Sequence, residues 1–88
     1  MHIIRTNGNV EEFTFKTDNH LKELQDVVGG YIERLKTEGG NIIVINEEGK
    51  LLGLPVNDKA SELYNNPQDN IVGDVLIGKD SEIFTKEP

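Results

Sequence analysis

The sequence predicts an α+β fold, a single small domain in which a mostly antiparallel sheet packs on two short helices in the order ββαβββαβ. Three observations predict this class. Short β-branched runs alternate with turn residues, and two segments repeat apolar residues at helical spacing. Residues 41–63 also place a strand, a turn, a second strand and a capped helix in direct succession. We take residues 1–88 as one domain because a chain of 88 residues is too short for two.

The first two strands are predicted to form a hairpin within residues 1–16. Two β-prone runs flank Asn7-Gly8-Asn9, and a glycine between such runs is typical of a tight hairpin turn. Side chains alternate along a strand, so Phe13 and Phe15 share one face of the second run. We therefore expect these two rings to contribute to the core.

A helix and two strands are predicted next. Apolar residues recur every three or four positions over residues 18–28, and Gly29 then offers a left-handed stop for a short amphipathic helix. Residues 31–36 alternate in the manner of a strand. The β-branched run at 41–45 is typical of a central strand that is covered on both faces.

The second half of the chain begins with another predicted hairpin. A polar turn at 46–49 leads into an apolar run at 50–54, which we assign to a strand. Asn57 is expected to cap a helix that begins at Asp58 and ends near Asn65, because its short side chain can accept from free amides of the first turn.

The last predicted strand covers residues 71–77, and it offers an exposed edge through which two copies of the chain could form a homo-oligomer. Residues 79–88 are expected to form a partly disordered tail that frays at 86–88. The positions that we expect to form the core are apolar residues of these elements: Phe13, Phe15, Leu21, Leu24, Val28, Ile43, Ile45, Leu52, Leu54, Ala60, Leu63, Val72 and Val75.

The composition excludes several classes of protein. The net charge of −7 repels phosphate backbones, so we expect no direct binding of nucleic acid. The apolar runs are far shorter than the roughly 20 residues of a membrane span. The chain has no cysteine, which removes disulfides and thiolate chemistry. No secretory signal follows Met1, so we expect a cytoplasmic protein without a membrane partner.

No constellation of catalytic or metal-binding residues stands out in the sequence. Glu47 and Glu48 are neighbours in a turn, where their carboxyl groups point to different sides and do not converge as an acid and base pair. His2 and His20 lack a nearby carboxylate cluster and make a poor metal site. We therefore predict a non-enzymatic protein with no catalytic residue, no metal and no cofactor.

Four residues are the candidates for ligand binding. Asn46 and Asn57 each flank a constrained stretch of backbone, from which an amide could contact a ligand, although turn and cap roles are the favoured interpretation. Tyr31 and Arg34 could also face a ligand, but they lie on opposite faces of one strand and so cannot both serve one site from that strand.

Three blocks of sequence carry a resemblance to a known family: VVGGYIE (27–33), INEEGKLLGLPVNDKASELY (45–64) and IVGDVLI (71–77). Over residues 19–78 the chain resembles domain of unknown function 3846, a family of small proteins found in phages, plasmids and Gram-positive bacterial genomes. The resemblance implies an α+β domain that is carried on mobile elements and expressed in a bacterial cytoplasm. It implies no catalytic residue.

The function that we predict is that of a small acidic accessory protein of a phage or mobile genetic element, which binds a protein partner. One alternative is a sponge for a small nucleotide signal. Arg5, Tyr31, Arg34 and Lys36 would then line a pocket, because phosphate needs cations and a base needs an aromatic ring to stack on. Another alternative is an acidic mimic of nucleic acid that binds a basic protein.

Overall fold

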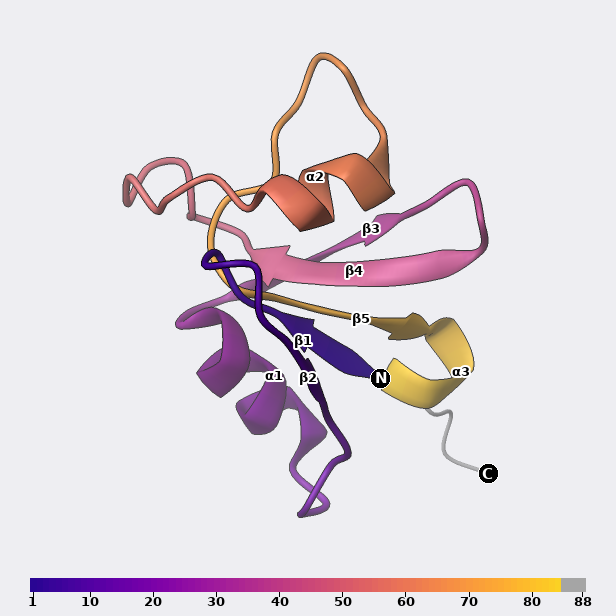
Figure 1. Ribbon diagram of the computed structural model, residues 1–88. Coiled ribbons are helices and arrows are strands. Elements are labelled where there is room, and N and C mark those ends of the chain that lie inside the picture. The colour runs from indigo at the N-terminus through magenta and orange to yellow at the C-terminus, as the bar shows by residue number, and fades with distance from the viewer. Residues whose placement is uncertain (85–88) are drawn as a thin grey trace.

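Residues 1–84 are described by the computed structural model, and they form five strands and three helices (Figure 1). The elements in chain order are β1 (His2–Ile4), β2 (Val10–Glu12), α1 (His20–Val28), β3 (Ile32–Lys36), β4 (Asn41–Asn46), α2 (Asp58–Tyr64), β5 (Val75–Lys79) and α3 (Asp80–Ile83). The strands make one sheet in the order β2-β1-β5-β4-β3, and every neighbouring pair is antiparallel. The predicted α+β class and mostly antiparallel sheet are therefore confirmed.

The strand predicted at 50–54 is absent from the sheet. The backbone of this segment bonds within itself instead, because Leu52 N–H donates to the carbonyl of Glu48 at 2.9 Å and Leu54 N–H donates to that of Gly49 at 3.0 Å. Turns therefore connect β4 to α2, and Leu51 is left 87% exposed. The end of the chain gains a short helix, α3, where we predicted a partly disordered tail. The predicted fraying at 86–88 lies outside the described residues.

β5 lies in the centre of the sheet, so the prediction of an exposed edge strand at 71–77 was wrong. Leu76 pairs with Ile3 of β1 on one side, and Ile77 pairs with Ile43 of β4 on the other. Both rows of backbone groups of this strand are consequently engaged. The two edges of the sheet are β2 and β3.

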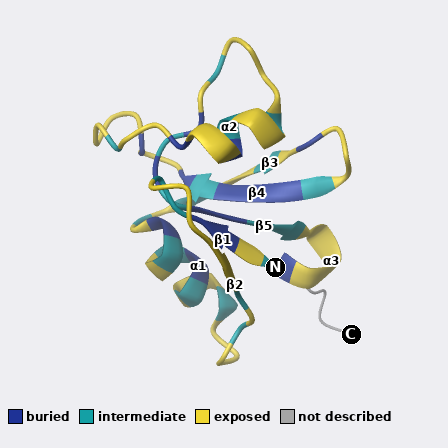
Figure 2. Ribbon diagram, in the orientation of Figure 1, coloured by how far each residue is buried: buried dark blue, intermediate teal, exposed yellow. Residues whose placement is uncertain are grey.

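Helices cover both faces of the sheet. In Figure 1, α2 lies on one side of the sheet and α1 on the other. The cluster that includes α1 and α3 consists of Ile3, Leu24, Val28, Ile42, Val44, Leu76 and Ile83. The cluster on the α2 side consists of Ile4, Ile43, Ala60, Ile71 and Val75. In Figure 2 buried segments, in dark blue, lie along the strands and on parts of the helices.

The predicted core is correct in part. Buried positions among those predicted are Leu24, Val28, Ile43, Ala60 and Val75, while Phe13, Phe15, Ile45, Leu54 and Val72 are half-buried. Three predictions were wrong, since Leu21, Leu52 and Leu63 are 53%, 60% and 49% exposed. The prediction missed Ile3, Ile4, Ile42, Val44, Ile71, Leu76 and Ile83. Consecutive strand residues are buried because each face of the sheet has its own covering helix.

The carboxyl end of α1 lies where the sequence predicted it, and Asn19 caps the other end. The side-chain oxygen of Asn19 accepts from Lys22 N–H at 3.2 Å, and Gly29 ends the helix in the left-handed region at a φ of 83°. The helix begins at His20, two residues later than predicted. None of the helices in the described residues is long and apolar enough to span a membrane.

Candidate functional site

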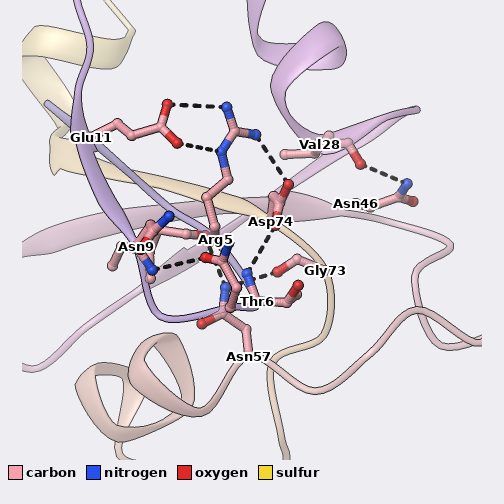
Figure 3. Close-up of polar contacts among 11 residues, drawn as sticks. Arg5, Thr6, Asn9, Glu11, Val28, Asn46, Asn57, Gly73 and Asp74 are labelled. Atoms are coloured by element: carbon pink, nitrogen blue, oxygen red, sulfur yellow. Dashed lines mark hydrogen bonds and ion pairs between the residues drawn. The ribbon is translucent and has the colours of Figure 1, made fainter.

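Asn57 is a buried side chain that joins three parts of the fold. Its Nδ2 donates to the carbonyl oxygens of Ile4 and Gly73, each at 2.9 Å (Figure 3). Its Oδ1 accepts from Ala60 N–H at 3.1 Å. The first two bonds tie the end of β1 to the loop before β5, and the third caps α2. The predicted cap role is confirmed, and the polar atoms of this side chain are engaged within the protein.

Asn46 is a second buried side chain that joins parts of the fold, in this case α1 and the end of β4. Its Nδ2 donates to the carbonyl of Val28 at 3.1 Å, and its Oδ1 accepts from Glu48 N–H at 2.8 Å. The residue is 4% exposed. A Cβ at Gly30 would lie 3.0 Å from Nδ2, so the glycine leaves room for this amide. Asn46 therefore shapes the turn that follows β4, the role that the favoured interpretation gave it, and it also holds the end of α1 against the sheet.

Arg5 lies between two carboxylates on the α1 side of the sheet. Its Nε and Nη2 donate to Glu11 at 2.9 and 3.2 Å, and its Nη1 donates to Asp74 at 3.0 Å (Figure 3). The other oxygen of Asp74 accepts from Thr6 N–H at 3.0 Å. The hydrogen bonds from Arg5 lower the pKa of Glu11, and the two carboxylates raise the pKa of Arg5. A guanidinium held in this way disfavours the phosphate role that the nucleotide alternative assigns to Arg5.

Arg34 lies on β3 and reaches the last helix. Its guanidinium carbon lies 4.7 Å from the centre of the Phe84 ring, and its Nη1 lies 3.7 Å from a carboxylate oxygen of Asp80. Both contacts are on the same side of the sheet as α3. Lys36 is two residues further along β3 and shares this face, because side chains alternate along a strand.

Tyr31 lines an open groove at the carboxyl end of α1. The groove has a volume of about 490 Å³, and its lining residues are Gln25, Asp26, Gly29, Gly30, Tyr31 and Glu48. The Tyr31 side chain is 65% exposed, while its carbonyl accepts from Glu47 N–H at 2.8 Å. A large aromatic side chain is thus presented to solvent by a backbone that is fixed against β4.

The four predicted site residues do not come together. Tyr31 lines the groove beside α1, whereas Asn57 lines a separate hollow of about 250 Å³ under the first hairpin turn. Asn46 lines a third hollow of about 110 Å³ on another part of the surface, and Arg34 packs on Phe84. Among residues 1–84, no three histidine, cysteine, aspartate or glutamate side chains are arranged to hold a metal ion.

A comparison with models of protein families shows which family the chain belongs to. A family model described as "Domain of unknown function (DUF3846)" matches residues 1–86. The chain belongs to the DUF3846 family. The match extends beyond the region at 19–78 that carried the resemblance, and it includes the first hairpin. The search of curated proteins and the search of solved structures gave no match.

The outer edge of this DUF3846 fold was missed by the sequence prediction. Among the strands of residues 1–84, β3 pairs with β4 alone, through a register that sets Ile32 opposite Asn46 and Lys36 opposite Ile42. The sequence shows that residues 31–36 alternate, but alternation does not reveal which strand of a sheet is outermost. The neighbours of a strand depend on pairings between segments that are distant in the sequence. In this sheet β5 lies between β1 and β4, which leaves β3 at the outer edge.

We expect this DUF3846 domain to lose stability as the pH falls below about 4.5. Hydrogen bonds from the backbone N–H of Lys16, and then from Thr17, lower the pKa of Glu23 from its ordinary value of 4.5, as Arg5 does for Glu11. A carboxylate with a lowered folded pKa contributes stability above its unfolded pKa and loses it as the pH falls through the folded value. Urea unfolding at pH 7 and pH 3 measures the loss.

Glu23→Gln is expected to reduce that loss between pH 7 and pH 3, because glutamine does not titrate. Glu62→Gln is the matched control, since the Glu62 side chain makes no hydrogen bond or ion pair with the rest of residues 1–84. A loss of stability of equal size in Glu23→Gln, Glu62→Gln and the unchanged chain would contradict the role given to Glu23.

Proposed function

We propose that this chain is a non-enzymatic protein-binding module, which adds an extended segment of a partner protein to its sheet along the outer edge of β3. It would act as a small acidic accessory protein of a phage or mobile genetic element in a bacterial cytoplasm, the setting that the resemblance to phage and plasmid proteins suggests. The open β3 edge is the observation that carries the proposal.

The hydrogen bonds of the β3–β4 pair show which backbone groups of β3 are used. Thr37 N–H donates to the carbonyl of Asn41 at 2.9 Å, and Glu47 N–H donates to the carbonyl of Tyr31 at 2.8 Å. Along an antiparallel pair, hydrogen-bonded residues alternate with residues whose backbone groups point away. The odd-numbered positions of β3 therefore bond to β4.

The even-numbered positions, Ile32, Arg34 and Lys36, then present their N–H and carbonyl groups outward. Within the described residues, no backbone or side-chain group bonds to them. A row of free donors and acceptors on an outer strand is a template for another strand, and main-chain hydrogen bonds are what supply the affinity in such pairings. The β3 edge therefore offers three such residues, one at every second position.

The opposite edge is less suited to the same use. β2 has only three residues, and two of them are Glu11 and Glu12. Short edge strands and charged side chains are devices that block unwanted pairing of edges. The contrast supports β3 as the edge that recruits a partner.

A different protein is a better occupant of the β3 edge than a second copy of the chain. An antiparallel pair of two β3 strands centred on Arg34 would place this residue directly opposite its copy. Lys36 lies on the same face, so four cations would gather there. Like charges that lie opposite one another destabilise a sheet. A segment with acidic or neutral side chains at these positions avoids the repulsion.

The polar side chains of the fold support binding over catalysis. Asn46, Asn57 and Arg5 are each held by hydrogen bonds to other parts of the protein. A catalytic site needs a nucleophile or base aimed at a place where substrate can sit. These residues instead hold secondary structure elements together.

Replacing Arg34 by proline tests the proposal. Twelve-residue peptides are first selected on the unchanged domain from a random library displayed on yeast. Arg34→Pro removes one outward N–H but leaves the bonds of Glu33 and Leu35 to β4, and proline is tolerated on edge strands for this reason. We expect the selected peptides to bind Arg34→Pro at least about tenfold more weakly, the effect of losing roughly 1.4 kcal/mol.

Arg34→Thr is the matched control, because it also loses the contacts with Phe84 and Asp80 yet keeps the N–H. It is expected to bind the peptides like the unchanged chain. Hydrogen exchange provides a second measurement, in which the amides of Ile32, Arg34 and Lys36 become protected when peptide binds. Peptides that bind Arg34→Pro and Arg34→Thr equally well, and that leave these amides exchanging freely, would show that strand addition at β3 is wrong.

A further inference from the structure

The groove beside Tyr31 continues the β3 edge at its amino end. Tyr31 immediately precedes Ile32, the first residue of β3. A strand advances by roughly 3.3 Å per residue, so a partner segment paired along β3 reaches the groove with the first residue or two beyond Ile32. The groove and the edge therefore form one continuous surface.

The walls of the groove carry negative charge. Asp26 and Glu48 both line it, and α1 ends there with carbonyl groups that give a helix terminus partial negative charge. The last turn of α1 has no basic residue to offset this charge. Lys22 is the cation that contacts the wall, through an exposed pair with Asp26 at 3.0 Å. The carboxylate of Glu48 has no ion pair with the rest of residues 1–84.

The groove is also lined by an aromatic ring and by two glycines, which have no side chains. Tyr31 is 65% exposed, and a tyrosine ring attracts a cation that lies over its face. Gly29 and Gly30 have no side chains to fill the space between Tyr31 and α1. Gly29 needs its φ of 83° to end the helix, and a Cβ at Gly30 would crowd Asn46. The glycines thus keep open a hollow of about 490 Å³, enough for a long side chain.

The geometry points to a specificity site for arginine: this groove binds an arginine side chain at the end of the partner segment that pairs with β3. This inference rests on the proposed function and adds the chemistry of the partner. A guanidinium is planar, stacks on an aromatic ring and donates to carboxylates at the same time, and it is less strongly hydrated than an ammonium group. Charge complementarity and continuity with the β3 edge both favour this occupant.

Citrulline provides the sharpest probe, because it keeps the shape of arginine and loses the charge. The yeast-display peptides selected on the domain are expected to be enriched in arginine at the end that lies beside Tyr31. Synthetic peptides with citrulline in its place are expected to bind about tenfold more weakly, which is the combined size of one cation–π contact and one exposed ion pair. In 1 M salt the difference should shrink, since exposed charges are screened.

Glu48→Gln and Glu47→Gln form a matched pair of variants with the same change in net charge. Glu48 lines the groove and Glu47, its neighbour, does not. We expect Glu48→Gln to reduce the preference for arginine over citrulline, and Glu47→Gln to leave it unchanged. Tyr31→Leu should reduce the preference too, through loss of the ring.

NMR shifts separate the inference from the proposed function. Amides of Ile32, Arg34 and Lys36 report strand addition, and amides of Gly29 and Gly30 report the groove. Arginine and citrulline peptides that bind equally and shift only the β3 amides would overturn the arginine site while strand addition stands. If no selected peptide shifts the β3 amides, strand addition is wrong and the inference falls with it.

Discussion

Replacing Asn57 by alanine is expected to lower the free energy of unfolding by about 3 kcal/mol, since it removes a helix cap and leaves buried backbone groups without partners. The carbonyls of Ile4 and Gly73 and the N–H of Ala60 all lose their bond to this side chain. A small domain has roughly 5 kcal/mol of stability in total. Asn57→Ala should therefore be close to unfolding at 37 °C. Urea unfolding followed by circular dichroism measures the change.

Asn57→Asp separates the two roles of this side chain. A carboxylate still accepts from Ala60 N–H, but it faces the carbonyls of Ile4 and Gly73 and donates to neither. Burial against these carbonyls would raise the folded pKa of the new acid above its unfolded value. The variant is therefore expected to gain stability relative to the unchanged chain as the pH falls from 7 to 5, because the folded state takes up a proton at this side chain more readily than the unfolded state does.

Asn70→Ala is the control for both variants, because Asn70 is exposed and its side chain makes no hydrogen bond with the rest of residues 1–84. Its stability should stay within about 0.5 kcal/mol of the unchanged chain. A loss in Asn57→Ala no larger than that in Asn70→Ala would refute the joining role of Asn57.

Shortening Leu76 to alanine is the second change with a large expected effect. Leu76 has no exposed surface, is the second residue of β5 and lies in one cluster with Leu24 and Val28 of α1. Loss of a leucine side chain in a core leaves a cavity and costs about 3–4 kcal/mol. We expect Leu76→Ala to be largely unfolded in mild denaturant, with a thermal midpoint far below that of the unchanged chain.

Leu52→Ala is the contrasting variant. The sequence prediction placed Leu52 in the core, whereas the structure leaves it 60% exposed in a turn. Surface substitutions of this kind usually change stability by less than about 0.5 kcal/mol. Equal losses of stability in Leu52→Ala and Leu76→Ala would mean that Leu52 is buried in the core, where the sequence prediction placed it.

Local signals in the sequence predicted most elements of the fold. Asn57 marks the start of α2 and Gly29 marks the end of α1, because capping depends on atoms within a few residues. The run at 50–54 misled the prediction, since apolar residues alone do not separate a strand from a compact turn. Its hydrogen bonds to the preceding residues decide the matter, and they depend on the whole connection to α2.

The candidate site was less predictable because it depends on contacts between distant segments. Asn46 and Asn57 were found as constrained polar residues, and their favoured structural roles are those observed. The open edge of β3 follows from the strand order, and the groove beside Tyr31 needs both the end of α1 and the turn after β4. Periodicity within one segment carries no information on either.

The central position of β5 has a consequence for the folding of the chain. The β1–β2 and β3–β4 hairpins each pair neighbouring segments, so each closes only a short loop. Among residues 1–84 β5 is the last strand, and in the sheet it lies between the two hairpins, setting Leu76 beside Ile3 and Ile77 beside Ile43. Pairings this distant slow folding. During synthesis the edges of β1 and β4 that pair with β5 therefore stay unpaired until Lys79 leaves the ribosome, and aggregation competes most strongly with folding in that interval.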